Sequence, residues 1–172
     1  MPGLLFAVSS KNRGGIVAKK PITVDEAYNR VASQCVIREY CRADWYRKLL
    51  TAGLTQQQVD EVLDRLEDDK FIDEERYCRS FVHDKLLYDR WGRIKITYSL
   101  RQKAIANEHI EAAMGTINEE EYMEILKEVI RQKRRSTKAE NDYELRQKLA
   151  RFAAGRGFEP GLIFKLLDLD DE

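Results

Sequence analysis

Apolar residues recur along the chain at helical spacing, each stripe preceded by a polar capping residue. Ala27, Val31 and Cys35 follow one another at intervals of four residues, which is the spacing of one face of an amphipathic helix. Thr23 precedes this stripe, and Glu26 follows Thr23 by three residues. Such a pair of side chains satisfies two free N–H groups at a helix start. Similar stripes continue toward the C-terminus, so the pattern predicts an all-α protein.

Local signals mark further helix starts and ends. A second helix is expected from about Arg42 to Ala52, with Gly53 ending it in a left-handed conformation. Thr55 and Gln58 form another capping pair before a third helix. Later polar caps are expected at Asp73, Asn107 and Asn141, and a third round of helices is expected to open near Asn118. Gly92 and Gly157 are expected to interrupt helices, and Pro160 to begin the last one.

The small and apolar positions repeat three times. Seven positions recur 51 residues later, and those recur again 53 residues later. The three sets are Trp45, Leu49, Gly53, Leu54, Val59, Val62, Leu63; Ile96, Leu100, Ala104, Ile105, Ile110, Ala113, Met114; and Leu149, Ala153, Gly157, Phe158, Ile163, Leu166, Leu167. Any two amphipathic helices align after sliding, but this alignment also keeps the helix break before Leu54 and its equivalents. We therefore predict three tandem three-helix repeats stacked into an elongated, curved body.

The helix breaks divide the chain into four segments. Residues 1–22 show no periodic apolar pattern and are expected to form a flexible N-terminal tail. Residues 23–72, 73–117 and 118–172 are expected to form the first, second and third repeats, the last ending in an acidic tail.

Composition agrees with a helical protein and narrows the setting. Of the 172 residues, 43% are hydrophobic and 35% are charged, with 30 basic and 30 acidic side chains that cancel. The three cysteines lack CxxC spacing, which indicates reduced thiols rather than a disulfide framework or metal site. The apolar run Leu4–Val8 is too short for a signal-peptide core, and no run is long enough to cross a membrane. We therefore expect a cytoplasmic protein.

Charge is unevenly distributed, and its basic part supplies the candidate binding residues. Residues 60–75 carry nine acids against two bases, whereas residues 79–103 carry seven bases against two acids. Basic side chains with interleaved aromatic rings can bind phosphates or an acidic protein face. The candidates are Arg90, Trp91, Arg93, Lys95, Tyr98, Arg101 and Lys103 in the middle repeat, and Arg131, Lys133, Arg134 and Arg135 in the third. The alternative for each is a solvated helix face, and for the second group a favourable interaction with the helix C-terminus.

Three segments carry a resemblance to a known family. They read IREYCRADWYRKLL from Ile37, VLDRLEDDKFIDEERYCRSFVHDK from Val62 and WGRIKITYSLRQKAI from Trp91. In this order and spacing they resemble the RecX family of recombination regulators, from about Val24 to the C-terminus. The segment from Tyr143 to Leu167 is similar to the final repeat of that family.

The resemblance implies a regulator of the RecA recombinase that uses no cofactor. It implies binding to RecA and to its filament on single-stranded DNA, with inhibition of ATP hydrolysis, filament extension and strand exchange. Weak direct binding to single- or double-stranded DNA stays open, and neither a membrane nor a small-molecule substrate is expected.

Two residues depart from the family pattern. Cys41 stands where Ser is common as a helix cap, and a thiol caps weakly. Ala104 stands where Gly is usual, and alanine resists the positive φ that such a turn needs. We expect a strained or differently shaped turn at Ala104.

No catalytic site is expected, so the competing functions are all binding functions. The two histidines, His83 and His109, lack metal-binding spacing, and no phosphate-binding glycine loop is present. One alternative is a direct DNA-binding helical module such as a transcription regulator. Its recognition helix, residues 55–66 or residues 107–114, would carry several acids that phosphates repel. Another alternative is a generic helical scaffold.

Overall fold

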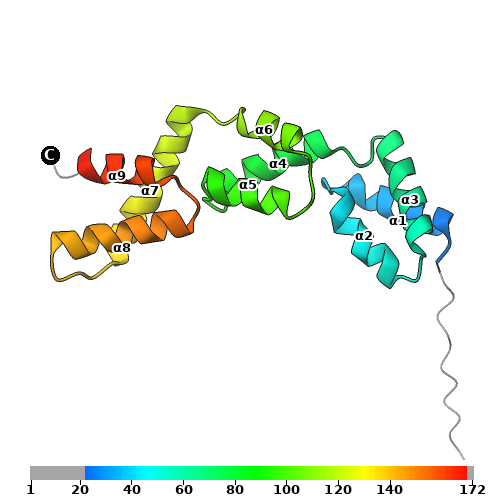
Figure 1. Ribbon diagram of the computed structural model, residues 1–172, viewed down its shortest axis with the longest axis horizontal. Helices are drawn as coiled ribbons and strands as arrows, with labels where there is room; N and C mark the ends of the chain where they lie inside the picture. The colour runs from blue at the N-terminus through cyan, green and yellow to red at the C-terminus, as the bar shows by residue number, and fades with distance from the viewer. Residues whose placement is uncertain (1–21, 170–172) are drawn as a thin grey trace, which may run out of the picture.

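The computed structural model describes residues 22–169 and confirms the all-α repeat fold. Three bundles of three helices lie in a row along the long axis of the molecule (Figure 1). The first bundle contains α1 (Val24–Cys35), α2 (Arg42–Thr51) and α3 (Gln56–Asp68). The second contains α4 (Glu74–Leu87), α5 (Arg93–Arg101) and α6 (Asn107–Met114). The third contains α7 (Glu119–Ser136), α8 (Asp142–Gly155) and α9 (Pro160–Leu169).

The predicted tails fall almost wholly outside the described residues. Within the expected tail of residues 1–22, only Ile22 is described, and it packs against the apolar core of the first bundle. The acidic residues Asp170, Asp171 and Glu172 also lie outside the described residues.

Most of the predicted helix caps are confirmed. The Glu26 N–H donates to Thr23 Oγ1 at 3.2 Å while the Thr23 N–H donates to Glu26 Oε2 at 3.0 Å. In the same way, the Gln58 N–H donates to Thr55 Oγ1 at 3.3 Å and the Thr55 N–H donates to Gln58 Oε1 at 2.9 Å. The predicted caps Asp73 and Asn141 also accept from the N–H three residues later, and Asn118, near which the third round of helices was expected to open, caps α7 in the same way.

The predicted cap at Asn107 is wrong. The extended residue before α6 is Ala106, and Asn107 is the first residue of the helix. Ile105 is buried before the helix and Ile110 is buried within it. To bury both side chains, the chain enters the helix directly after Ala106. The Asn107 side chain instead accepts a hydrogen bond from Arg101 Nε at 3.4 Å.

The three repeats share one unusual backbone position. Gly53 has φ 100°, Ala104 has φ 56° and Gly157 has φ 89°, and these residues are equivalent in the sequence alignment of the repeats. Left-handed backbone costs a non-glycine residue about 1–2 kcal/mol. The strained turn expected at Ala104 is therefore confirmed, and the shared geometry supports a true triplication.

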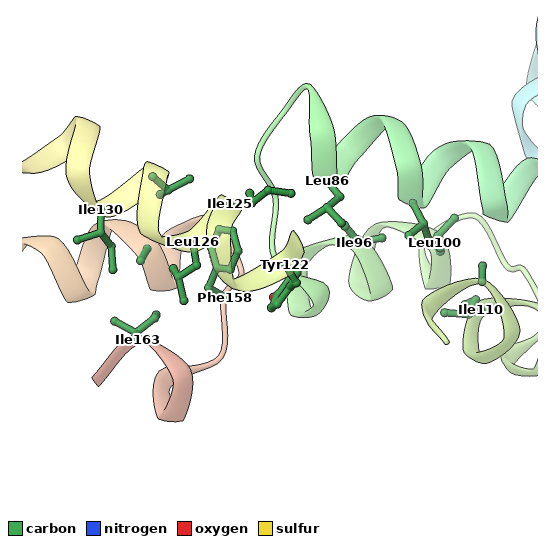
Figure 2. Close-up of a cluster of buried hydrophobic side chains, with 14 of the residues drawn as sticks. Leu86, Ile96, Leu100, Ile110, Tyr122, Ile125, Leu126, Ile130, Phe158 and Ile163 are labelled. Carbon is green, nitrogen blue, oxygen red and sulfur yellow. The ribbon is translucent and has the colours of Figure 1, made fainter. Parts of the chain in front are cut away.

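The apolar core is divided unequally among the bundles. One cluster of buried side chains fills the first bundle, from Ala27 to Ile72. A second, continuous cluster fills the second and third bundles together and also includes Cys41, at the start of α2. Figure 2 shows Leu86 and Ile96 of the second bundle facing Tyr122 and Ile125 of the third within this cluster. The last two bundles therefore form one packed body, to which the first is attached.

Candidate partner-binding surface and the junctions beside it

The aromatic candidate at the start of the middle basic segment is held between two lysines. Trp91 is half-buried, and its ring centroid lies 4.8 Å from Lys85 Nζ and 4.2 Å from Lys95 Nζ. The Trp91 N–H donates to Lys85 O at 2.9 Å, which fixes the chain as it leaves α4. These cation–π contacts hold the ring in place and leave only part of it for a partner.

Arg93 is occupied by the third bundle. Its guanidinium pairs with Glu119 at 2.5 Å and Glu159 at 3.4 Å, and lies 4.0 Å from the Tyr122 ring centroid. Only 21% of the side chain is exposed. The Tyr122 hydroxyl accepts from the Arg93 N–H at 3.0 Å and donates to Glu159 at 2.6 Å. Arg93 thus joins two bundles, a role that its position in a basic run did not indicate.

The N-terminus of α5 also receives its capping bonds from the third bundle. The Gly92 N–H donates to Arg156 O at 2.8 Å, and the Ile94 N–H donates to Gly157 O at 3.0 Å. A Cβ atom at Gly92 would lie 2.2 Å from Gly157 O. The absence of a side chain therefore allows the backbones of two repeats to meet, and the free N–H groups of a helix start are satisfied across the junction.

Lys103 is occupied at the other junction, between the first and second bundles. Its Nζ donates to Asp44 Oδ1 at 2.5 Å. Burial works to raise the pKa of Asp44, but hydrogen bonds from Lys103 and from the Cys41 N–H hold that pKa below its usual value. A second bridge joins Arg76 Nε to Glu39 Oε1 at 2.5 Å. A cleft of about 650 Å³ opens beside both pairs.

Two further middle-repeat candidates, Tyr98 and Arg101, lie on the outer face of α5. Tyr98 is 63% exposed and Ile94, one turn before it, is 52% exposed. Arg101 follows at helical spacing on the same face and is exposed. This short stripe of one apolar, one aromatic and one basic side chain is accessible to a partner.

The third-repeat candidates are spread around the last turns of α7. Arg131 pairs with Glu128 on the same helix. Arg134 lines a small cavity beside Asp142, and Arg135 is exposed. Lys133 turns inward, with its Nζ 4.9 Å from the Phe152 ring centroid. The four side chains therefore do not form one face.

The structure brings Arg90 and Lys133 together although they belong to different repeats. Both line a hollow of about 270 Å³ between the second and third bundles, together with Arg156. Sequence reasoning missed Arg156, because it lies in a turn where the helical period stops. Arg156 directly precedes Gly157, whose equivalents in the other two repeats also lie in turns. This position is the one signal that could have drawn attention to Arg156.

Four of the nine acids in residues 60–75 bind partners within the first bundle. Three carboxylates of α3, those of Asp60, Asp64 and Glu67, surround the Arg42 guanidinium at 2.9, 2.7 and 3.0 Å. Asp69 accepts from the Tyr28 hydroxyl at 2.6 Å. These acids stabilise the packing of α3 against α1 and α2.

The described residues contain neither a disulfide bond nor a cluster of metal-ligating side chains. Cys35, Cys41 and Cys78 are free and buried, and burial raises the pKa of Cys41 and Cys78 to about 11. Among residues 22–169, no three metal-ligating side chains gather into a cluster. No helix in that range is long and apolar enough to span a membrane.

Comparisons with known proteins identify a family that shares this sequence and architecture. A model of the second three-helix domain of RecX matches residues 73–114, and a model of the third three-helix domain matches residues 119–167. Regulatory protein RecX of Pseudomonas putida (strain GB-1) is 31% identical over 137 residues, which are 78% of this chain and 86% of the relative. The chain belongs to the RecX family. The resemblance recognised from the sequence is thereby confirmed.

Other RecX proteins match over different lengths. The relative from Clostridium tetani is 30% identical over 115 residues, or 66% of this chain and 52% of the relative. The chain thus spans about half the length of the clostridial RecX proteins it matches. The relative from Mycobacterium sp. (strain KMS) is 23% identical over 166 residues, covering 94% of this chain and 91% of the relative.

Two solved RecX structures share the fold. A crystal structure of regulatory protein RecX aligns with a TM-score of 0.77 and 23% identity, over 87% of this chain and 73% of that one. The crystal structure of RecX from Lactobacillus salivarius aligns with a TM-score of 0.70 and 19% identity, over 85% of this chain and 97% of that one.

Proposed function

We propose that this protein regulates RecA by binding the recombinase and its filament on single-stranded DNA in the cytoplasm. In this role it lowers ATP hydrolysis and limits filament extension and strand exchange. The observation that carries the proposal is membership of the RecX family by a chain built as three similar bundles in a row. A row of similar units can offer like faces to successive protomers of a filament. The protein acts stoichiometrically, without a cofactor or catalytic group.

The contact surface is assigned to the accessible candidates. The outer face of α5 presents Tyr98 and Arg101, two residue types that are enriched in binding hot spots, beside the exposed Ile94. Arg93 and Lys103 contribute by holding neighbouring bundles in position. The other candidates, Arg90, Trp91, Lys95, Arg131, Lys133, Arg134 and Arg135, remain proposed contacts.

The deciding experiment measures single-stranded-DNA-dependent ATP hydrolysis by the cognate RecA, titrated with this protein up to equimolar amounts. We expect the rate to fall, with no ATP hydrolysis by this protein alone. The double variant Tyr98→Ser/Arg101→Gln should require about tenfold more protein for the same inhibition, because it removes two hot-spot side chains.

The matched control is Tyr143→Ser/Arg30→Gln, which removes an exposed tyrosine and an exposed arginine at positions that are not equivalent to Tyr98 or Arg101 in the other repeats. It should inhibit like the unmodified protein. Failure of the unmodified protein to slow RecA, on both growing and preformed filaments, would overturn the proposed function. Equal inhibition by the two double variants would overturn the assignment of the surface.

The second candidate function is direct binding to DNA as a transcription regulator. If α3 served as its recognition helix, Asp60, Asp64 and Glu67 would approach the phosphates, and they already surround Arg42. The observation in favour of DNA contact is the basic hollow between the second and third bundles. Tight, strongly salt-dependent binding to duplex DNA with no effect on RecA would favour this function.

A further inference from the structure

The first junction, between the first and second bundles, and the second junction, between the second and third, can be compared residue by residue. The repeats align at fixed offsets, so Cys41 is equivalent to Gly92, and Ala104 is equivalent to Gly157. Gly92 and Gly157 meet at the second junction, whereas Cys41 and Ala104 both carry a side chain. The two junctions therefore differ at the positions where the backbones of neighbouring repeats approach each other.

The contact at the second junction leaves no room for a side chain on either partner. A Cβ atom at Gly92 would lie 2.2 Å from Gly157 O, and a Cβ atom at Gly157 would lie 2.3 Å from Lys95 Cβ. This close approach allows two backbone hydrogen bonds to cross the junction, from the Gly92 N–H to Arg156 O and from the Ile94 N–H to Gly157 O. We call this arrangement the glycine clasp.

The glycine clasp is missing from the first junction. The Cys41 N–H donates to Asp44 Oδ2 at 3.1 Å within its own bundle, rather than to a carbonyl of the second bundle. Among residues 22–169, no backbone hydrogen bond joins the first bundle to the second. The Cβ atoms of Cys41 and Ala104 keep the two backbones from approaching as closely as at the second junction, and a cleft of about 650 Å³ stays open between the bundles.

One buried side chain and two ion pairs hold the first junction instead. Cys41 is fully buried, and among the described residues it is the one member of the first bundle in the core cluster of the other two. The ion pairs are Lys103 with Asp44 and Arg76 with Glu39, and their side chains are 20–42% exposed. Ion pairs with this exposure contribute little to stability and weaken with salt.

The covalent link places the pivot of the first junction. A short stretch of chain joins α3 to α4 (Figure 1). Ile72 is fixed to the first bundle, because its N–H donates to Leu66 O at 3.0 Å and its side chain is buried in that bundle's core. Asp73 is fixed to the second bundle, because its side chain accepts from the Arg76 N–H at 2.9 Å. Rotation of one bundle against the other is therefore concentrated in the backbone dihedrals between Ile72 and Asp73.

We propose that the first junction is a hinge, while the glycine clasp keeps the second and third bundles rigid. The first bundle pivots about Cys41 and the link between Ile72 and Asp73, and the cleft widens and narrows as it moves. Small polar interfaces permit relative motion of domains, whereas large apolar interfaces prevent it. The two ion pairs act as latches that favour one position of the hinge. The row can thus change its bend at one joint, and this property belongs to the free protein without RecA.

The experiment measures distance distributions in the full-length protein by pulsed electron paramagnetic resonance. Spin labels attached to p-acetylphenylalanine leave the three native cysteines in place. Labels at Gln57 and Ala112 span the first junction, and labels at Ala112 and Arg151 span the second; all three positions are exposed. We expect the distribution across the first junction to be about twice as wide as that across the second. Equal widths would overturn the hinge.

The latches are tested with Arg76→Gln/Lys103→Gln, which removes the cation of each ion pair across the first junction. We expect the distribution across the first junction to widen further, in this variant and in the unmodified protein at high salt. The matched control is Arg79→Gln/Lys127→Gln, which removes two cations whose partners lie on their own helices. It should change neither distribution. Equal widening in both variants would show that the two bridges are not latches.

The cause of the open junction is tested with Cys41→Gly/Ala104→Gly, which removes both Cβ atoms. Glycine suits position 41, because its equivalent Gly92 is the N-cap of α5. We expect a narrower distribution with a shorter mean distance across the first junction. Cys41→Ala, which keeps a Cβ atom, should stay as wide as the unmodified protein.

Circular dichroism checks that the double glycine variant folds. A folded double glycine variant with an unchanged distribution would show that the two side chains do not hold the junction open. The comparison of the two junctions and the latch variant need no glycine substitution, so the hinge stays testable if that variant does not fold. RecA is absent from every measurement, so failure of the hinge leaves the proposed regulation of RecA standing.

Discussion

The two junctions between neighbouring bundles are built by different physics. Between the second and third bundles, buried apolar side chains form one continuous core, and Gly92 lets two backbones meet (Figure 2). Between the first and second bundles, the two apolar clusters are separate apart from Cys41 of the first bundle, which is buried in the second cluster, and ion pairs such as Lys103 with Asp44 bridge a cleft.

This difference divides the row into a two-bundle body and an attached first bundle. Burial of apolar surface is strong and insensitive to pH, whereas partly exposed ion pairs contribute about 0–1 kcal/mol and weaken with salt. Changes at the junction between the second and third bundles should therefore affect the global stability of the protein. Changes at the first junction, between the first and second bundles, should affect mainly how stability responds to pH and salt.

The largest effect is expected from Gly92→Ala. The added Cβ would lie 2.2 Å from Gly157 O and 2.3 Å from Phe158 N, which are backbone atoms that cannot rotate away. We expect a loss of about 3 kcal/mol or more in the free energy of unfolding, measured in urea.

Gly155→Ala is the matched control, because nothing lies within 4 Å of a Cβ atom at that helical position. It should be neutral or gain up to about 1 kcal/mol from helix propensity. A mild Gly92→Ala phenotype would mean that the backbones of the two repeats are not tightly packed.

A smaller loss is expected from Tyr122→Phe at the same junction. The ring stays, but the Arg93 N–H and Glu159 lose a buried hydroxyl partner. The loss of unfolding free energy should be about 1–3 kcal/mol, because buried polar groups are left unsatisfied. Tyr28→Phe, which removes a hydroxyl bond to Asp69 on the exposed side of the first bundle, should change stability far less. Equal losses of unfolding free energy in Tyr122→Phe and Tyr28→Phe would contradict the proposed difference between the buried junction and the exposed side of the first bundle.

The first junction should be sensitive to acid. Because the folded pKa of Asp44 is held below its usual value, its stabilising effect is present above the unfolded pKa and is lost as pH falls through the lower folded pKa. The stability advantage of the unmodified protein over Asp44→Asn should be about 1 kcal/mol near neutrality. Urea unfolding at a series of pH values should show this advantage vanishing in acid.

Asp68→Asn provides a comparison at an exposed acid of α3. Near neutrality the unfolding free energy of that variant should lie within about 0.5 kcal/mol of the unmodified protein, because the side chain is exposed. A constant advantage over Asp44→Asn in acid would show that the Lys103 bridge does not stabilise the junction through charge.

The smallest effect is a gain, expected from Ala104→Gly. Ala104 has φ 56°, while the equivalent positions in the other two repeats are glycines. Relief of this strain should raise the unfolding free energy by about 0.5–1 kcal/mol. Ala112→Gly, an exposed position within α6, should instead lose about 1 kcal/mol from helix propensity. Thermal unfolding measures both changes, and a loss at position 104 would show that the turn is not strained.

Much of the fold could be predicted because its signals are local. Thr23 with Glu26 and Thr55 with Gln58 act within one helical turn, so the sequence alone locates these helix starts. The error at Asn107 arose because the buried neighbours of α6, not its polar residue, set where the helix begins.

The candidate site was less predictable because its members meet across repeats. Arg93 resembled its basic neighbours in sequence, yet Glu119 and Glu159 of another bundle engage it. Arg90 and Lys133 were separate candidates until the packed bundles placed them, with Arg156, around one hollow.

By itself, the sequence determined that this chain folds into three like helical units, because apolar spacing, caps and left-handed turns act over a few residues. Only the tertiary structure decided how those units join. Which cations are paired and which remain for a ligand depends on the carboxylates that another bundle presents, and no local pattern records that arrangement.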